Sequence, residues 1–145
     1  MKLGRRGVID LPIRLMIVVL IVCISIPLLT GAMERGESNN AASAMSAEAD
    51  KIFNSVAAVH YSGIGSSRTV TVTIPDGSEM SIPGGDGPDA YSIKMAFKGR
   101  ELGVRYMDNP PIRFVTDGIA MTGSVMLLLT SDIIGDRYVV RVDVV

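Results

Sequence analysis

The chain opens with a long apolar stretch. Residues 15–33 contain no charged side chain and are dominated by Leu, Ile, Val and Met. In an α-helix a segment of this length rises about 28 Å, close to the ~30 Å hydrocarbon core of a bilayer. The pattern therefore predicts a helix that can span a membrane.

A second helical pattern follows in residues 38–60, which contain neither Pro nor Gly. Apolar residues recur there at spacings of three and four, which is typical of an amphipathic helix. They are Ala42, Met45, Ala49, Ile52, Phe53, Val56 and Val59. Pro27 lacks a backbone donor, and Gly31 and Gly36 lower the helix propensity, so we expect a kink near Pro27 rather than a break. Residues 8–37 and 38–60 should form one nearly continuous helix.

Beyond residue 60 the period of the pattern changes to two. Gly63 and Gly65 end the helix, and residues 68–74 alternate Val or Ile with Thr, as in a half-buried strand. After the turn at 75–77, residues 78–82 can return antiparallel to that strand. Further strands are predicted at 90–97, 101–107, 112–115, 119–121, 124–130 and 137–144.

These strands predict the fold class of the domain formed by residues 61–145. Their connections are too short for crossover helices, so the sheet should be mainly antiparallel, as a small sandwich or a partly wrapped sheet. Residues 125–129 are apolar on both sides, which indicates a central strand. The apolar face of the sheet needs a covering element, and the stripe of helix 38–60 offers one. The class is therefore α+β.

The distribution of charged residues predicts the orientation of the chain across a membrane. Residues 1–14 hold four basic residues and one acid, a net charge of +3, whereas residues 34–145 hold 10 basic and 14 acidic residues, a net charge of −4. Because basic flanks stay on the cytoplasmic side, the N-terminus should be cytoplasmic and the C-terminal domain extracellular. No basic stripe suits nucleic acid, so we expect no nucleic-acid partner.

The sequence offers few candidate residues for catalysis or metal binding. His60 lies at the end of the helix without convincing additional metal ligands, and Asp86 and Asp89 lack the spacing of a calcium loop. The only cysteine, Cys23, lies inside the apolar stretch, where it is best interpreted as a small apolar filler. No G-x-S-x-G motif occurs. We expect no enzyme activity, no cofactor and no metal site, and partner contacts at exposed loops such as 83–89 and 108–111.

The order of these segments resembles that of a known protein family. A basic leader ending in Arg6-Gly7, an apolar helix, an Ala-rich amphipathic helix and a small β domain together resemble type IV pilin-like proteins, above all archaeal ones with class III signal peptides. The resemblance implies that a membrane-embedded prepilin-type peptidase cuts between Gly7 and Val8, which removes residues 1–7. It also implies that residues 8–37 remain in the mature protein, where they contact the lipid bilayer. Through them, copies of the protein or related pilin-like subunits assemble into an extracellular or cell-surface filament. Pro12 stands where bacterial pilins carry an assembly glutamate, and Asp10 is the nearby carboxylate that can substitute for it.

Two other interpretations stay open. In the first, the same segment is an ordinary secretory signal cut after Thr30-Gly31-Ala32, so that a free β domain starting at Met33 is secreted. In the second, nothing is cut, and the protein is a single-pass anchor that displays a binding module. The start of the mature chain distinguishes the three.

Overall fold

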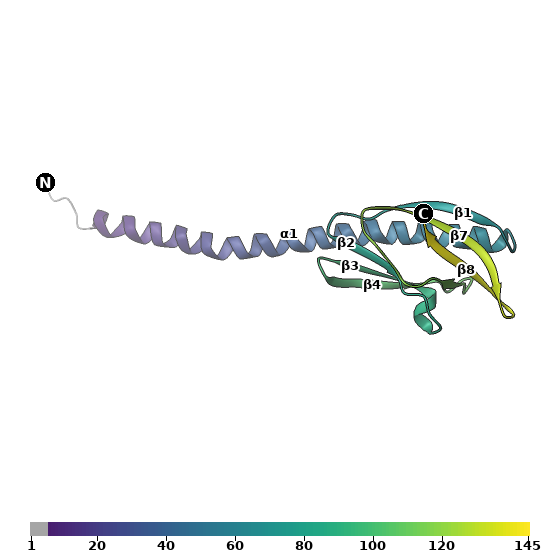
Figure 1. The fold of residues 1–145 in the computed structure, drawn as a ribbon. Coiled ribbons are helices and arrows are strands. Elements are labelled where there is room, and N and C mark those ends of the chain that lie inside the picture. Colours follow the sequence, from purple (N-terminus) through teal and green to yellow (C-terminus); the bar gives the residue numbers. More distant parts are fainter. Residues whose placement is uncertain (1–5) are drawn as a thin grey trace. The chain divides into compact units, whose positions relative to one another are not determined.

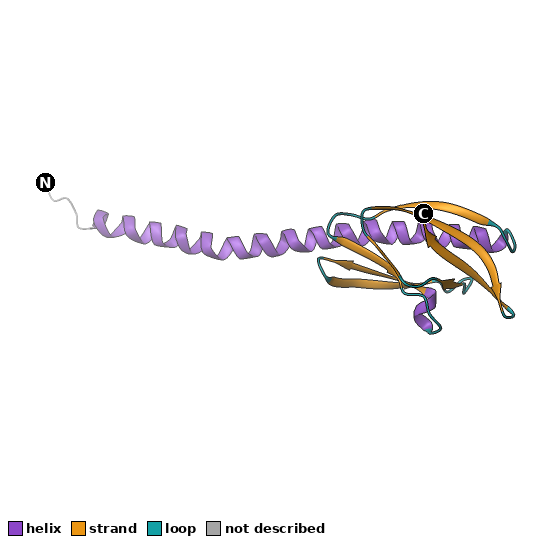
Figure 2. Ribbon diagram, viewed as in Figure 1, coloured by secondary structure: helices purple, strands orange, loops and turns teal. Residues whose placement is uncertain are grey.

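A computed structural model describes the backbone of residues 6–145 and the side chains from residue 11 onward. The chain divides into two units, Met1–Glu37 and Ser38–Val145. Helix α1 (Arg6–Tyr61) contributes to both units, and the strands all belong to the second (Figure 1, Figure 2). The predicted α+β class is confirmed. The helix continues through Pro12 and Pro27 without a break.

The part of α1 in the second unit buries a stripe of its surface. Met45, Ala49, Ile52 and Val56 are fully buried, at the three- and four-residue spacings that the sequence predicts. At the N-terminal end of the stripe the prediction is wrong by one residue, because Ala41 is buried and Ala42 is only partly covered. Burial of this stripe ties the helix to the sheets.

The strands form two four-stranded sheets. One sheet has the order β1 (Ser67–Thr73), β7 (Ser124–Ile134), β8 (Arg137–Val144) and β5 (Arg113–Val115). The other has the order β4 (Arg100–Tyr106), β3 (Ser92–Phe97), β2 (Ser78–Ile82) and β6 (Ile119–Met121). Strands β5 and β8 pair in parallel, and every other described pair is antiparallel. The mainly antiparallel arrangement is as predicted.

The pairing of β1 corrects one expectation. The sequence suggests a hairpin of residues 68–74 and 78–82, but β1 pairs with β7, whereas β2 pairs with β3 and β6. The turn at Pro75-Asp76-Gly77 therefore carries the chain from one sheet to the other. A turn signal predicts a change of direction, and it does not say which strand becomes the partner.

Two strand boundaries differ from the prediction by more than one residue. A 3₁₀ helix, η1 (Pro88–Tyr91), occupies the start of predicted strand 90–97, and β3 begins only at Ser92. Proline fixes the backbone angle that suits the first turn of a helix, which explains this start. Strand β7 extends to Ile134 instead of ending at residue 130, and it lies between β1 and β8, so the predicted central position is confirmed.

The core of the second unit combines the stripe of α1 with the inner faces of both sheets. Phe114 of β5 is fully buried and stacks on Phe53 of α1, with ring centroids 6.2 Å apart and planes within 4°. Leu127 and Leu129 of β7 face this core, while Met126 between them is 44% exposed on the opposite face. Only one face of β7 is therefore packed into the core.

Candidate membrane and assembly segment

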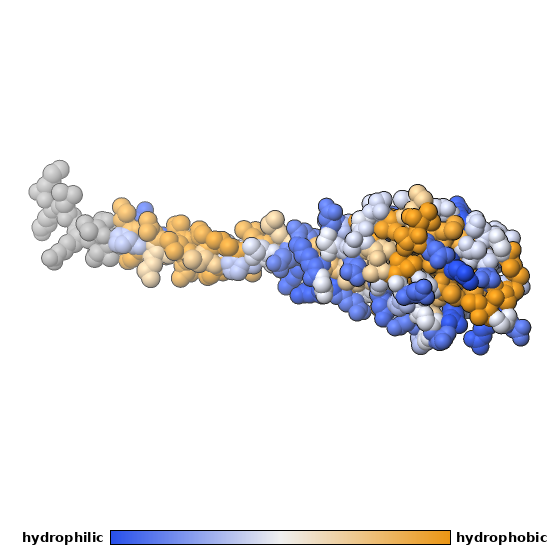
Figure 3. Space-filling model, viewed as in Figure 1, coloured by the Kyte–Doolittle hydropathy of each residue, from blue (hydrophilic) through white to orange (hydrophobic). Residues whose placement is uncertain are grey.

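The apolar residues near the N-terminus are exposed along the whole helix. Every large apolar side chain that the structure describes between Leu11 and Met33 is 49–71% exposed. Figure 3 shows them as a continuous run of hydrophobic residues. A water-soluble protein rarely leaves so long an apolar surface uncovered, and by length and composition this segment could span a membrane.

The polar side chains of the segment are satisfied by its own backbone. The Ser25 hydroxyl donates to the carbonyl oxygen of Ile21 at 2.7 Å. The Thr30 hydroxyl lies 3.1 Å from each of two carbonyl oxygens, those of Ile26 and Pro27. An unpaired hydroxyl in hydrocarbon costs several kcal/mol, whereas these hydroxyls have partners within the helix. The segment therefore fits an environment that offers no water.

Charged residues mark both ends of the uncharged stretch formed by residues 15–33. Arg14 precedes it, and Glu34, Arg35 and Glu37 follow it, all with exposed side chains. Between Arg14 and Glu34 lie residues 15–33, the uncharged stretch singled out in the sequence. Among residues 11–145, α1 is the one helix long and apolar enough to cross a membrane.

The residues of the predicted cleavage site lie at the start of α1. Arg6, Gly7, Val8 and Asp10 belong to its first turns, where the structure describes no side chains. Leader residues 1–5 lie outside the described residues. Cleavage after Gly7 and an assembly role for Asp10 therefore stay predictions from the sequence.

Asp86 and Asp89, the carboxylates considered for a calcium loop, form ion pairs with neighbouring residues. Asp86 pairs with Arg113, which also donates to the carbonyl oxygen of Gly85. Asp89 accepts from Lys94 at 3.0 Å, and this hydrogen bond and the carboxylate charge raise the pKa of Lys94. Within the described part of the chain, no group of three Cys, His, Asp or Glu side chains is placed to hold a metal ion. Loop 83–89 is thus held against β5.

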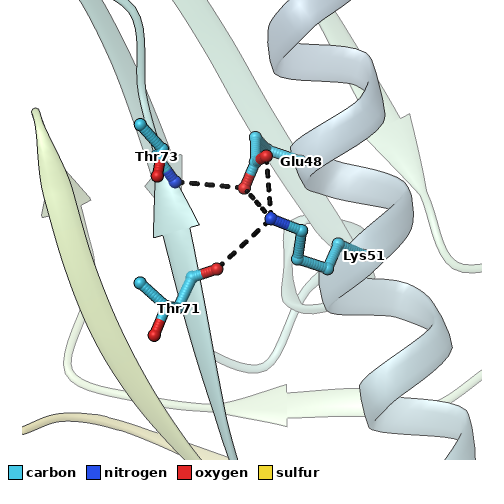
Figure 4. A network of polar contacts seen from close by, with 4 residues as sticks. All are labelled: Glu48, Lys51, Thr71 and Thr73. Carbon is cyan, nitrogen blue, oxygen red and sulfur yellow. Dashed lines mark hydrogen bonds and ion pairs between the residues drawn. The ribbon is translucent and has the colours of Figure 1, made fainter.

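A polar clasp that the sequence did not reveal joins α1 to the edge of a sheet. We call it the α1–β1 clasp, and it consists of Glu48, Lys51, Thr71 and Thr73 (Figure 4). The Glu48 carboxylate accepts from the Thr73 backbone N–H at 3.0 Å and from Lys51 Nζ at 2.8 Å. Lys51 Nζ also donates to the Thr71 carbonyl oxygen at 3.4 Å. Because β1 is an edge strand, the clasp occupies backbone groups that would otherwise be open to another strand.

The sequence indicates the contact within the helix but not the contact between the helix and β1. Glu48 and Lys51 are three residues apart, a spacing at which opposite charges meet on a helix. Their contact with β1, however, joins positions about 20 residues apart or more along the chain, and no local pattern indicates it. The contact with β1 also covers the Glu48 side chain, which is only 17% exposed.

An exposed apolar patch is the second feature that the sequence did not reveal. We call it the tip patch, and its members are Tyr61, Ile64, Ile133, Ile134 and Tyr138, which are 39–74% exposed. It joins the end of α1 to the β7–β8 hairpin, since the rings of His60 and Tyr138 meet edge to face at 5.6 Å. Paired hydrogen bonds between Gly65 N and Ser131 O and between Ser131 N and Ser66 O hold the two segments together. Figure 3 shows hydrophobic residues gathered where this hairpin turns.

Comparison with family models, curated proteins and solved structures finds no match. What the chain shows is an α+β fold in which one exposed apolar helix precedes a β-sheet domain. This architecture fits a pilin-like or membrane-anchored protein.

Proposed function

We propose that the protein is a pilin-like structural subunit of a cell-surface filament, assembled through its N-terminal helix. The observation that carries the proposal is the exposed apolar surface of residues 11–33, in a helix whose later turns are packed into a folded domain. Such a helix can lie in a bilayer before assembly and against the helices of other copies afterwards. We propose no enzymatic role.

The physical chemistry supports this exchange of surroundings. Lipid tails and the apolar side chains of neighbouring helices are similarly nonpolar, so the transfer between them changes hydrophobic free energy little. The hydroxyls of Ser25 and Thr30 keep their intrahelical acceptors in both environments. Close packing between copies of the helix then supplies the free energy of association.

In this proposal the leader is processed on the cytoplasmic side of the membrane. A prepilin-type peptidase cuts after Gly7, and the mature chain starts at Val8. Four basic residues against one acid before residue 15 favour a cytoplasmic leader and an extracellular β domain. Asp10 takes the place of the assembly glutamate and pairs with the new amino terminus of a neighbouring copy.

The experiment is N-terminal sequencing of the native protein, combined with electron microscopy of the cell surface. The proposal predicts a chain that starts at Val8 and is found in filaments. A Gly7→Leu variant should block cleavage and abolish the filaments while the chain stays in the membrane. A Val8 form that remains monomeric in membranes at native expression overturns the proposal.

A single-pass anchored domain is the second candidate. Pro12 occupies the position of the pilin glutamate, and Arg14 lies only one residue before the uncharged stretch. Both residues are compatible with an uncleaved membrane anchor, in which basic residues before the span hold the N-terminus in the cytoplasm. In that case the native chain keeps Met1 and forms no filament, and the β domain acts as a binding module.

A further inference from the structure

A small open cavity lies between α1 and the loop that follows β4. Its volume is about 260 Å³, and it is lined by residues of α1, by the last residue of β4 and by residues 107–109. Arg105 donates to the side chains of Ser46 and Asp50, which ties β4 to the helix just before the cavity. The Met107 N–H donates to the Tyr91 carbonyl oxygen at 2.8 Å, which holds the start of the loop. The walls of the cavity are therefore fixed by the fold.

The inner part of the cavity is apolar. Phe53 and Ala57 line it one helical turn apart on α1, and both pack against the core. Met107, which is buried, lines it from the loop. The stacking of Phe53 on Phe114 holds the Phe53 ring in place. Because Ala57 is small, space remains beside this ring, and the inner surface offers an aromatic group and C–H groups to a ligand.

The outer rim of the same cavity is polar. It is formed by the exposed side chains of Asn54, Tyr106, Asp108 and Asn109. The two amides and the phenol hydroxyl can both donate and accept hydrogen bonds, whereas a carboxylate only accepts. Asp108 belongs to none of the ion pairs found among residues 11–145. The rim therefore suits a ligand with several groups that also both donate and accept, namely hydroxyl groups.

We propose that this cavity binds a neutral monosaccharide, either free or as a unit of a glycan. A sugar ring carries C–H groups on its faces and hydroxyl groups around its edge, which matches the apolar interior and the polar rim. The faces of aromatic rings carry negative charge density that attracts such C–H groups. The Asp108 carboxylate repels acidic sugars, so the ligand is neutral. This inference goes beyond the filament proposal, and it holds equally for an anchored chain.

The test is saturation-transfer NMR on the full-length protein in phosphatidylcholine nanodiscs. The probes are glucose, galactose, mannose and N-acetylglucosamine, each as the free sugar and as its methyl glycoside. At least one of them should bind with a Kd of about 1–10 mM, the range that a ligand with roughly twelve heavy atoms reaches in a small open site. Binding of a glycoside identifies a glycan unit as the ligand, and binding of the free form alone identifies a free sugar. No binding by any of these probes overturns the proposal.

Variants locate the binding in the cavity. Tyr106→Ala removes part of the rim and Ala57→Leu fills the interior, so each should weaken binding about tenfold or more. Tyr138→Ala is the matched control, since Tyr138 lies outside the cavity and is 54% exposed against 48% for Tyr106. It should bind as the parent does, and thermal unfolding of Tyr106→Ala should match that of Tyr138→Ala. Equal binding by these two tyrosine variants overturns the proposed site.

An organic cation is the rival ligand, because aromatic rings beside a carboxylate also attract an ammonium group. Tetramethylammonium is the probe for this rival. If it binds while no sugar does, and Asp108→Ala abolishes its binding, the cavity is a cation site and the sugar proposal is overturned. If a neutral sugar binds, Asp108→Ala should weaken it about tenfold and the control Asp143→Ala should not. Tyr106→Ala should still form filaments, so a failed sugar test leaves the filament proposal standing.

Discussion

Membrane insertion of the apolar segment is the prediction with the clearest magnitude. Residues 15–33 contain eleven Leu, Ile and Val residues. On insertion scales each of these contributes about −0.3 to −0.6 kcal/mol, so together they favour insertion by roughly 5 kcal/mol. The perturbation replaces Leu20 and Ile24, both near the middle of the segment and both 55% exposed, by Asp.

Each Asp near the centre of a span costs about 3 kcal/mol, in addition to roughly 0.5 kcal/mol lost with the apolar side chain. The single variant Ile24→Asp should therefore still insert, with a margin of about 1.5 kcal/mol. The double variant Leu20→Asp with Ile24→Asp loses roughly 7 kcal/mol and should no longer insert. Neither residue touches the core of the second unit, so the β domain should fold unchanged.

The assay is alkaline extraction of membranes followed by detection of the chain in pellet and supernatant. The parent and Ile24→Asp should remain in the pellet, and the double Asp variant should move to the supernatant. The double variant Leu20→Ala with Ile24→Ala is the matched control, because it removes the same side chains without adding charge. The reasoning is refuted if the double Asp variant stays in the pellet as firmly as the Ala control, or if the parent itself is extracted.

Three further predictions concern the second unit. An alanine Cβ at Gly84 would lie 2.3 Å from the Thr116 carbonyl oxygen, whereas at Gly85, also at positive φ, it would meet nothing within 4 Å. Thermal unfolding should show that Gly85→Ala lowers the free energy of unfolding by about 1 kcal/mol and Gly84→Ala by about 3 kcal/mol. Equal losses in the two variants would contradict the close approach of Gly84 to the Thr116 carbonyl oxygen. Glu48→Ala should lower the free energy of unfolding in urea by about 2 kcal/mol, because the backbone N–H of Thr73 loses its acceptor. Amide exchange at Thr73 should become faster, and an unchanged exchange rate would argue against the clasp. Because the pKa of Lys94 is raised in the folded protein, Lys94 keeps its charge and its ion pair below the pKa of an unfolded lysine and loses them only as pH rises through the raised pKa. An NMR titration should show a lower Lys94 pKa in Asp89→Asn. An unchanged Lys94 pKa would contradict the pairing.

Local patterns in the sequence predict the elements of this fold better than their pairing. The three- and four-residue spacing from Met45 to Val56 predicts the buried stripe of α1, and the alternation of Val and Thr predicts β1. Both patterns report which side of a single element is covered. The partner of β1 is β7, more than fifty residues away, and nothing in the turn after β1 encodes that choice.

The candidate sites also differ in whether the sequence could predict them. The exposed segment 15–33 was predicted because its length and composition are those of a helix that can span a membrane. The tip patch was not predicted, because the predicted strand ends at residue 130, before Ile133 and Ile134, and the exposure of these residues depends on where the β7–β8 hairpin lies beside Tyr61. The clasp was missed because Glu48 binds a backbone N–H, and a backbone group carries no sequence signal.

The most direct test of the filament proposal is the intact mass of this protein in the sheared, pelleted fraction of native cell surfaces. The proposal predicts that the pellet contains the chain starting at Val8, with residues 15–33 retained. A chain found only in the membrane fraction with Met1 intact, or only in the medium starting at Met33, would contradict it.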